Sequence, residues 1–124
     1  MDTNFLMIPG QFKVDIFSEL KRLINEPFDV YIHESTVGEL EKFSKGNTKA
    51  KLHANVALKL IKQKNLKRLA NSVNEKYTDD LILEGVTSKD IVCTQDQVLK
   101  RRLKAFHKGI RLITLKSKKY LNFE

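Results

Sequence analysis

Short apolar segments typical of β-strands alternate with amphipathic helix patterns along this chain of 124 residues. Residues 14–24 and 49–64 repeat apolar side chains at three- and four-residue steps, which predicts two helices. Residues 28–32, 90–94 and 110–115 are short and rich in strand-forming side chains. Strands separated by helices form parallel sheets that helices cover on both faces. The chain therefore predicts an α/β fold with three α/β/α layers around a central parallel sheet.

The remaining segments continue this alternation. Further helices are expected over residues 35–43, from Thr78 onwards and over residues 95–107. A short strand is expected over residues 66–70, and the tail beyond Lys116 is basic and then aromatic. In the helix over residues 49–64, the side expected to face the core carries Leu52, Val56, Ala57, Leu60 and Ile61.

Length and composition limit the classes of protein to consider. One domain over residues 1–124 is expected, because a chain of this length holds one sizeable core but not two. No apolar run approaches the roughly 20 residues that span a bilayer, and the opening lacks a signal-peptide pattern. The single cysteine, Cys93, forms no internal disulfide, and the three histidines have no zinc spacing. These features predict a cytoplasmic protein with Cys93 in its core.

The net charge of +8, from 23 basic and 15 acidic residues, bears on the binding partner. A basic surface attracts phosphate groups, so a polyanionic substrate is expected. A basic surface that serves only solubility is the alternative.

Four acidic residues stand where a predicted strand gives way to a turn or a helix: Asp2, Glu39, Asp80 and Asp96. Strand ends on one side of an open α/β sheet share a single crevice. Carboxylates gathered there repel one another unless a cation holds them, and a divalent metal is the expected cation. The set predicts metal-dependent cleavage of phosphodiester bonds.

Each acid also has a purely structural interpretation. Glu39 stands three residues after Thr36 and fits a capping box. Asp79 and Asp80 fall in the first turn of an expected helix, where carboxylates are favoured, and Asp96 follows a candidate N-cap. Adjacent helical side chains point about 100° apart, so Asp79 and Asp80 do not both face one metal. We favour Asp80.

The segments around these acids carry a resemblance to a known family. They are Asp2-Thr3-Asn4-Phe5-Leu6, Glu39-Leu40, Tyr77-Thr78-Asp79-Asp80, Ile91-Val92-Cys93-Thr94-Gln95-Asp96 and Leu99-Lys100-Arg101-Arg102-Leu103. Over nearly its whole length the chain resembles the PIN-domain family of metal-dependent ribonucleases. It is most similar to the branch of the small-subunit ribosomal RNA processing nuclease and its archaeal relatives.

This resemblance implies a function for each acid. Asp2, Glu39, Asp80 and Asp96 are expected to be catalytic, and Asp2, Asp80 and Asp96 are expected to hold Mg²⁺ or Mn²⁺. The residues expected to support the site are Asn4, Asp79 and Thr94.

One departure from the family concerns its first strand. That strand runs through several apolar residues ahead of the first aspartate and lies in the middle of the sheet, whereas only Met1 precedes Asp2 here. A sheet without its middle strand leaves backbone groups unpaired. Either the true start lies upstream of Met1, or the first strand is truncated and its place is empty or filled in another way. In the second case we expect reduced stability and a displaced Asp2.

The resemblance also implies an RNA substrate, single-stranded or locally open. Six basic residues after Asp96 are candidates to follow its backbone: Lys100, Arg101, Arg102, Lys104, Lys108 and Arg111. A solvated helix face explains them equally well. The path would extend through Lys116, Lys118, Lys119 and Tyr120.

Three functions follow from these expectations. The first is an endoribonuclease in ribosomal RNA processing, acting on a ribosomal RNA precursor with a ribosome-assembly protein as partner. The second is a VapC-type toxin ribonuclease, held silent by an antitoxin that blocks the acidic site. The third is a non-catalytic RNA-binding scaffold. PIN domains often pair, so a homodimer is also implied.

Overall fold

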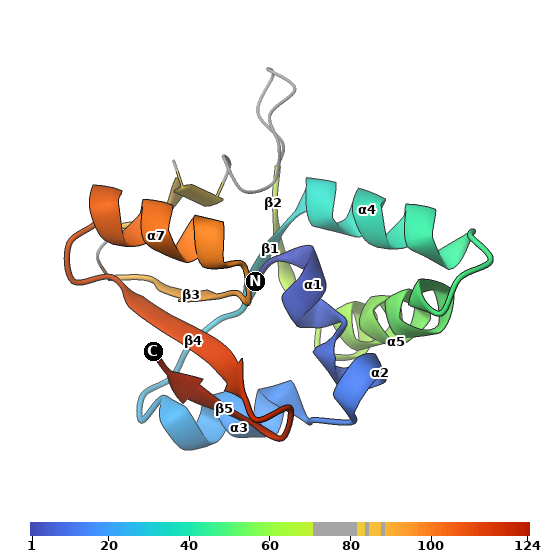
Figure 1. Ribbon diagram of the computed structural model, residues 1–124, viewed down its shortest axis with the longest axis horizontal. Coiled ribbons are helices and arrows are strands. Elements are labelled where there is room, and N and C mark those ends of the chain that lie inside the picture. The colour runs from blue at the N-terminus through green and yellow to red at the C-terminus, as the bar shows by residue number, and fades with distance from the viewer. Residues whose placement is uncertain (71–81, 84, 88) are drawn as a thin grey trace.

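The computed structural model describes residues 1–70, 82, 83, 85–87 and 89–124 (Figure 1). The elements in chain order are α1 (Thr3–Leu6), α2 (Ile8–Phe12), α3 (Ile16–Leu23), β1 (Tyr31–His33), α4 (Glu34–Ser44), α5 (Ala50–Gln63), β2 (Lys67–Leu69), β3 (Ile91–Cys93), α7 (Gln97–Phe106), β4 (Arg111–Lys116) and β5 (Tyr120–Phe123). The helix expected from Thr78 onwards lies largely outside the described residues, as do Asp79 and Asp80.

Both sheets of the described residues contain a parallel pair. β1 pairs with β2, so that Ile32 lies opposite Arg68, and β3 pairs with β4, so that Val92 lies opposite Leu112. Helices α4 and α5 connect β1 to β2, and α7 connects β3 to β4. The α/β prediction is confirmed, although the strands form two sheets, β1-β2 and β3-β4-β5.

Different helices cover the two faces of the β3-β4-β5 sheet. Successive strand residues point to opposite faces, so Leu112 packs with Leu99 and Leu103 of α7 while Ile113 packs with Leu20 of α3. Figure 1 shows α7 and α3 on opposite sides of β4. Cys93 is buried on the α3 side as expected, and burial raises the pKa of its thiol to about 11. This sheet is therefore the middle of three layers.

Helix α5 turns only part of the expected side to the core: Ala57 and Ile61 are buried as predicted, and Leu60 is partly buried. Ala54, Ala57 and Ile61 are buried, whereas Leu52 is 69% exposed and Val56 is 38% exposed. The buried side carries small residues because α2 approaches closely: a Cβ on Gly10 would lie 2.9 Å from the Cα of His53. The expectation that Leu52 and Val56 face the core is therefore wrong.

The tail after Lys116 forms β5, which the sequence did not predict. β5 pairs antiparallel with β4 through a turn in which Ser117 and Lys118 have φ of 53° and 55°. Two side chains of α3 hold it: Arg22 donates to the carbonyl of Leu121 at 2.7 Å, and Glu19 accepts from its amide at 3.0 Å. The tail is therefore part of the fold.

The first residues of the chain join the two sheets. The amino group of Met1 donates to the carbonyl of Tyr31 in β1 at 3.2 Å, and the amide of Asp2 donates to the carbonyl of Cys93 in β3 at 3.4 Å. Residues after Asp2 turn into α1. Met1 and Asp2 thus bridge β1 and β3 without forming a strand of their own. None of the described helices is long and apolar enough to cross a membrane.

Candidate active site

The carboxylate of Asp2 lies where the start of the chain meets the end of β3. Its Oδ1 accepts from the amide of Phe5 at 2.9 Å and so caps α1, and its Oδ2 accepts from the hydroxyl of Thr94. Thr94 follows β3 directly and is fully buried, and Asp2 is 5% exposed. Asp2 is therefore fixed at the carboxyl end of β3.

Asp96 contacts the same hydroxyl from the other side. Its amide donates to Oγ1 of Thr94 at 3.1 Å. Its carboxylate accepts from the amides of Val98 at 2.8 Å and Leu99 at 3.1 Å, so Asp96 itself is the N-cap of α7. Asp2 and Asp96, ninety-odd positions apart in the chain, are joined through one side chain.

The environment of Asp2 disfavours its charged form. Burial raises the pKa of Asp2 by more than the hydrogen bonds from Thr94 and Phe5 lower it, and the negative charge of Asp96 adds a smaller upward shift. The ammonium of Met1 acts in the opposite direction. A cation bound beside Asp2 would favour the charged form of its carboxylate.

Glu39 connects to the site through Thr3. Its Oε2 accepts from the hydroxyl of Thr3 at 3.1 Å. Helix α4 begins at Glu34 with His33 as its N-cap residue, so Thr36 lies inside the helix and caps nothing. The hydroxyl of Thr36 is buried with no hydrogen-bond partner among the described residues. The capping-box interpretation of Glu39 is therefore wrong.

Of the described residues expected to support the site, only Thr94 contacts it. Thr94 lies between the two aspartates, whereas Asn4 is exposed on α1. Asp79 and Asp80 lie outside the described residues. We use the name acidic site for the group that the structure brings together, which is Asp2, Glu39, Thr94 and Asp96.

The acidic site fits a hard divalent cation in the kind of its donors. Asp2, Glu39 and Asp96 offer carboxylate oxygens, which Mg²⁺ and Mn²⁺ prefer. In the part of the chain that the structure describes, no three acidic, histidine or cysteine side chains are grouped closely enough to hold a metal ion. Asp80, the third acid of the expected metal set, is outside that part.

His33 is a neighbour of this region that sequence reasoning missed. It ends β1, is 9% exposed, and its Nδ1 has no hydrogen-bond partner among the described residues. Burial lowers the pKa of His33, and the ammonium of Met1 lowers it further, which favours the neutral ring. A single histidine has no motif spacing that would mark it as a site residue. Only its position at the end of a predicted strand could have suggested that it lies near the site.

Lys100 does not lie on the surface expected to bind RNA. It is 3% exposed, its ammonium donates to the hydroxyl of Thr114 at 2.9 Å, and it pairs with Glu124 at 3.1 Å. The hydroxyl of Thr114 in turn donates to Oε1 of Gln95. This corrects the expectation for Lys100, which is part of the interior beneath α7.

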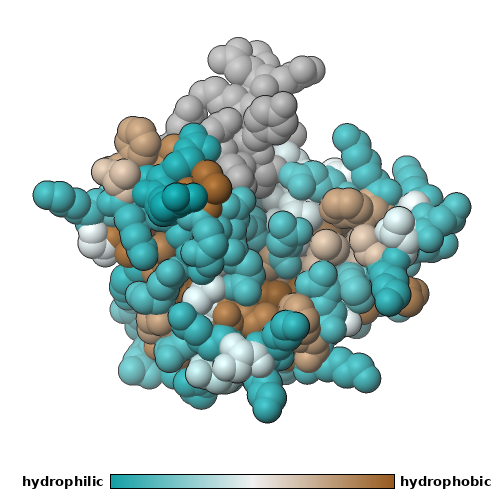
Figure 2. Space-filling view, viewed as in Figure 1, coloured by the Kyte–Doolittle hydropathy of each residue, from teal (hydrophilic) through white to brown (hydrophobic). Residues whose placement is uncertain are grey.

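The other basic candidates follow α7 away from the acidic site. Arg101 is exposed, and Lys104 is exposed beside Glu124 at 3.8 Å. Lys108 follows the end of α7, whose ten residues span about 15 Å. Arg111 begins β4 opposite Ile91, at the other end of the strands from Asp96. Hydrophilic side chains cover much of the α7 side (Figure 2).

In metal-free buffer, Asp2→Asn is expected to raise stability at neutral pH. A carboxyl whose pKa is raised on folding binds protons more readily in the folded state, so its ionised form lowers stability above the unfolded pKa. Asparagine keeps an oxygen for the amide of Phe5 and carries no charge. Thermal unfolding from about pH 4 to pH 8 should show its advantage growing as pH rises.

Asp15→Asn is the matched control, because Asp15 caps α3 in the same way. Asp15 accepts from the amide of Ser18 at 3.1 Å and from its hydroxyl at 2.8 Å, and these bonds lower the pKa of Asp15. Its charge therefore adds stability at neutral pH that is lost as pH falls through the lowered pKa. If both variants lost stability at neutral pH, burial would not disfavour the Asp2 carboxylate.

Known proteins share sequence and fold with this chain. A family model described as PIN like domain matches residues 1–118. Ribonuclease VapC4 of Methanocaldococcus jannaschii is 33% identical over 122 residues, which cover 96% of this chain and 90% of the relative. The rRNA-processing protein FCF1 of Saccharomyces cerevisiae is 30% identical over 123 residues, which cover 98% of this chain and 61% of the relative.

A solved structure shares the fold. The PIN domain endonuclease Utp24 superposes with a TM-score of 0.81 at 26% identity, over 99% of this chain and 87% of that chain. Sequence and fold thus agree over nearly the whole length, and the chain belongs to the PIN-like domain family.

Proposed function

We propose that the protein is a metal-dependent endoribonuclease that hydrolyses RNA phosphodiester bonds in ribosomal RNA processing. The observation that carries the proposal is the pairing of Asp2 and Asp96 through Thr94, with the pKa of Asp2 raised. Relatives named as a ribonuclease and as an rRNA-processing protein support RNA as the substrate. The lone buried Cys93 supports a cytoplasmic site of action.

Each residue of the acidic site has a part in this chemistry. Asp2, Asp80 and Asp96 would hold Mg²⁺ or Mn²⁺, and the metal, when bound, lowers the pKa of a water and stabilises charge on the phosphate. Glu39, held by Thr3, would orient the attacking water. Thr94 is a positioning residue, since its hydroxyl bonds Asp2 and the backbone of Asp96. The assigned supporting residues are Asn4 and Asp79.

Removing the metal tests this proposal directly. A labelled RNA hairpin is incubated with the protein and Mn²⁺, with and without an excess of EDTA. We expect cleavage that EDTA abolishes and that added Mg²⁺ or Mn²⁺ restores, because the metal would lower the pKa of the attacking water and stabilise charge on the phosphate. Cleavage that continues in EDTA would contradict a metal-dependent reaction.

We propose that RNA follows the cations of α7 that are not buried, which are the exposed Arg101 and Lys104 and the half-buried Arg102. Lys108 and Arg111 lie farther from the acidic site and would contact only longer RNA. Lys100 is left out because it is buried. Cations along one helix contact phosphates without reading sequence, so this path gives affinity and not specificity.

Arg101→Ala is expected to weaken binding of single-stranded RNA uniformly across sequences. Loss of one phosphate contact lowers the slope of log affinity against log salt by about 0.7. Fluorescence anisotropy at several salt concentrations measures both quantities. Lys51→Ala, which removes an exposed lysine from α5, is the matched control and should leave the slope unchanged. An equal effect of both substitutions would mean that net charge alone drives binding.

A VapC-type toxin ribonuclease is the second candidate. The 33% identity to VapC4 favours it, since the match extends over 90% of the length of that relative. A toxin should arrest growth on expression, and co-expression of a neighbouring antitoxin should relieve the arrest. A non-catalytic scaffold would instead bind RNA without cutting it and be indifferent to EDTA. These outcomes separate the three functions.

A further inference from the structure

The turn between β4 and β5 lies at the same edge of the sheet as the acidic site. β3 and β4 are parallel, and Cys93 pairs with Ile113. Asp96 stands three residues after the first of these, and Lys116 stands three residues after the second. Parallel strands in register end at one edge of a sheet. The turn of residues 117–119 therefore projects from the edge at which the acidic site lies.

The end of α2 lies beside this turn. The ammonium of Lys118 lies 5.9 Å from the centre of the Phe12 ring. Phe12 is 36% exposed, and Tyr120, which pairs with Lys116 across the turn, is 42% exposed. We use the name turn surface for the exposed or half-buried aromatic and basic residues gathered here, which are Phe12, Lys13, Lys116, Lys118, Lys119 and Tyr120.

The turn surface is strongly basic. Three of its lysines fall within residues 116–119, and neither that stretch nor residues 11–13 contains an acid. Two acids close to it along the chain already have partners: Asp15 accepts from the amide of Ser18, and Glu124 pairs with Lys100. The ligand that complements this surface is therefore a polyanion.

The backbone of this surface suits glycine better than lysine. Lys13, Ser117 and Lys118 have φ of 56°, 53° and 55°. Glycine adopts this left-handed region without strain, whereas a residue with a Cβ pays a cost in conformational energy. Lysines at two of these positions indicate that their side chains, and not the turn geometry alone, are required.

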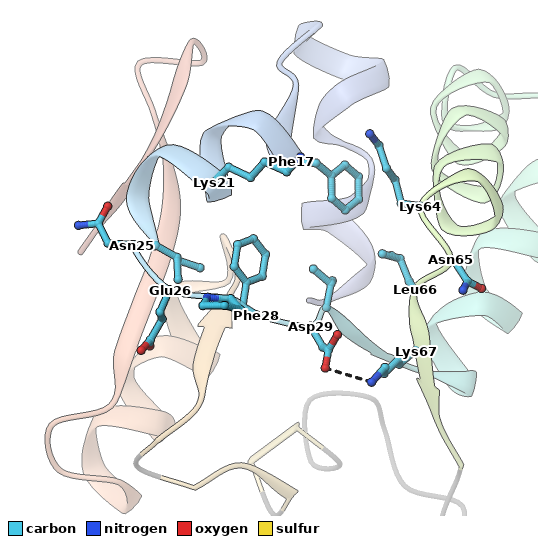
Figure 3. Close-up of a pocket in the computed structure, with 13 residues that line it drawn as sticks. Phe17, Lys21, Asn25, Glu26, Phe28, Asp29, Lys64, Asn65, Leu66 and Lys67 are labelled. Carbon is cyan, nitrogen blue, oxygen red and sulfur yellow. Dashed lines mark hydrogen bonds and ion pairs between the residues drawn. The ribbon is translucent and has the colours of Figure 1, made fainter.

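Another group of lysines and aromatic rings surrounds a cavity of about 620 Å³ near the start of β2. There the ammonium of Lys64 lies 5.6 Å from the centre of the Phe17 ring, and Figure 3 shows these two side chains close together. Phe17 is only 8% exposed, and Lys67 pairs with Asp29 at 3.0 Å. A buried ring and a neutralised lysine suit RNA less well than the turn surface does.

Building on the proposed nuclease function, we propose that the turn surface binds single-stranded RNA on the other side of the acidic site from the cations of α7. Figure 1 shows α7 leading away from the N-terminus in one direction, and the turn between β4 and β5 on the other side of it. RNA that crosses the acidic site then meets lysines on both sides of the reacting phosphate. Phe12 and Tyr120 stack against bases, and the lysines contact phosphates.

Binding of a fluorescein-labelled uridine oligonucleotide of about 16 nucleotides, in EDTA, tests this surface. Lys118→Gln keeps a long side chain and removes its charge. The slope of log affinity against log salt, measured by anisotropy, should fall by about 0.7. Lys64→Gln is the matched control, because Lys64 makes the same kind of contact with Phe17 near the start of β2, and the slope should stay unchanged.

Two further measurements test stacking and the position of the surface. Phe12→Ala should weaken binding at least about fivefold, whereas Phe12→Tyr, which keeps a ring, should bind as the original protein does. An RNA of about four nucleotides spans about 14 Å and reaches only one of the two surfaces. Lys118→Gln should weaken its binding at most about twofold, because α7 still holds it.

Three results would each overturn the proposal. They are an unchanged slope with Lys118→Gln, equal effects of the two lysine substitutions, and an equal loss of affinity for the long and the short RNA. All are read from binding, whereas cleavage that EDTA abolishes decides the proposed nuclease function. A protein that binds RNA through the turn surface without cutting it would keep this proposal and lose the nuclease function.

Discussion

Replacing Asp96 by asparagine is expected to abolish RNA cleavage and leave the fold intact. Asp96 caps α7 through the amides of Val98 and Leu99, and it places a negative charge beside Asp2. Asparagine caps a helix about as well as aspartate does, so the first contribution survives. The charge that would hold the metal is lost, and the cleavage rate should fall at least about a hundredfold.

Two measurements separate chemistry from folding in this variant. Single-turnover cleavage with Mn²⁺ gives the rate, and thermal unfolding gives the stability. Asp15→Asn is the matched control, since it makes the same exchange at the N-cap of α3 and should cleave at the original rate. Cleavage by Asp96→Asn at the original rate would remove this carboxylate from the metal set. A large loss of stability in Asp96→Asn alone would mean that a weakened helix cap, and not a lost metal ligand, explains the slower cleavage.

The elements that sequence predicted well are those whose signals are local. Residues 14–24 show a single apolar stripe, and the helix found there, α3, is capped by Asp15 within its own first turn. The apolar runs of β3 and β4 suit strands covered on both faces. Periodicity and caps act within a few residues, so a single sequence displays them.

The wrong predictions concern residues whose burial or conformation depends on contacts with residues far away in the sequence. Helix α5 has two apolar sides, and hydropathy favoured the one with Leu52 and Val56. Ala54 is buried in place of these two residues, beside the correctly predicted Ala57, because small side chains admit close neighbours such as α2. β5 went unpredicted because its turn places Ser117 and Lys118 at positive φ, where glycine or asparagine would have been the usual signal.

In the acidic site, too, the local features were predictable from the sequence and the long-range contacts were not. The order of the four acids along the chain indicated which residues to consider, and Asp2 and Asp96 do meet at Thr94. The link from Glu39 to Thr3 spans 36 positions and has no local signal, so a capping box seemed sufficient. A single sequence indicates candidate donors at strand ends but not the hydrogen bonds that orient them.

Lys100 was assigned to the surface because it stands in a run of basic residues, although its helical position indicated otherwise. Residues three apart share a helix face, and Leu103, three residues after Lys100, is fully buried. The ammonium is neutralised inside the protein by Glu124 and bonded to Thr114, which bonds Gln95 beside Asp96. Lys100 therefore stabilises the segment that carries the acidic site.

Lys100→Met is accordingly expected to lower stability by about 2 kcal/mol and the Tm by about 8 °C. Methionine keeps the apolar stem, so the change removes the ammonium and its bonds to Thr114 and Glu124. Lys104→Met is the matched control: it removes an exposed partner of the same Glu124 at 3.8 Å and should cost less than about 1 kcal/mol.

RNA binding should reverse the order of these two variants. Lys104→Met removes an exposed charge from α7 and should weaken binding, whereas Lys100→Met, measured below its Tm, should bind as the original protein does. A Lys100→Met variant with unchanged Tm and weakened RNA binding would return this residue to the RNA path. The two variants should differ because Lys100 is buried and Lys104 is exposed. The ammonium of Lys100 bonds Thr114, and through it Gln95, and pairs with Glu124, so it does not contact phosphate.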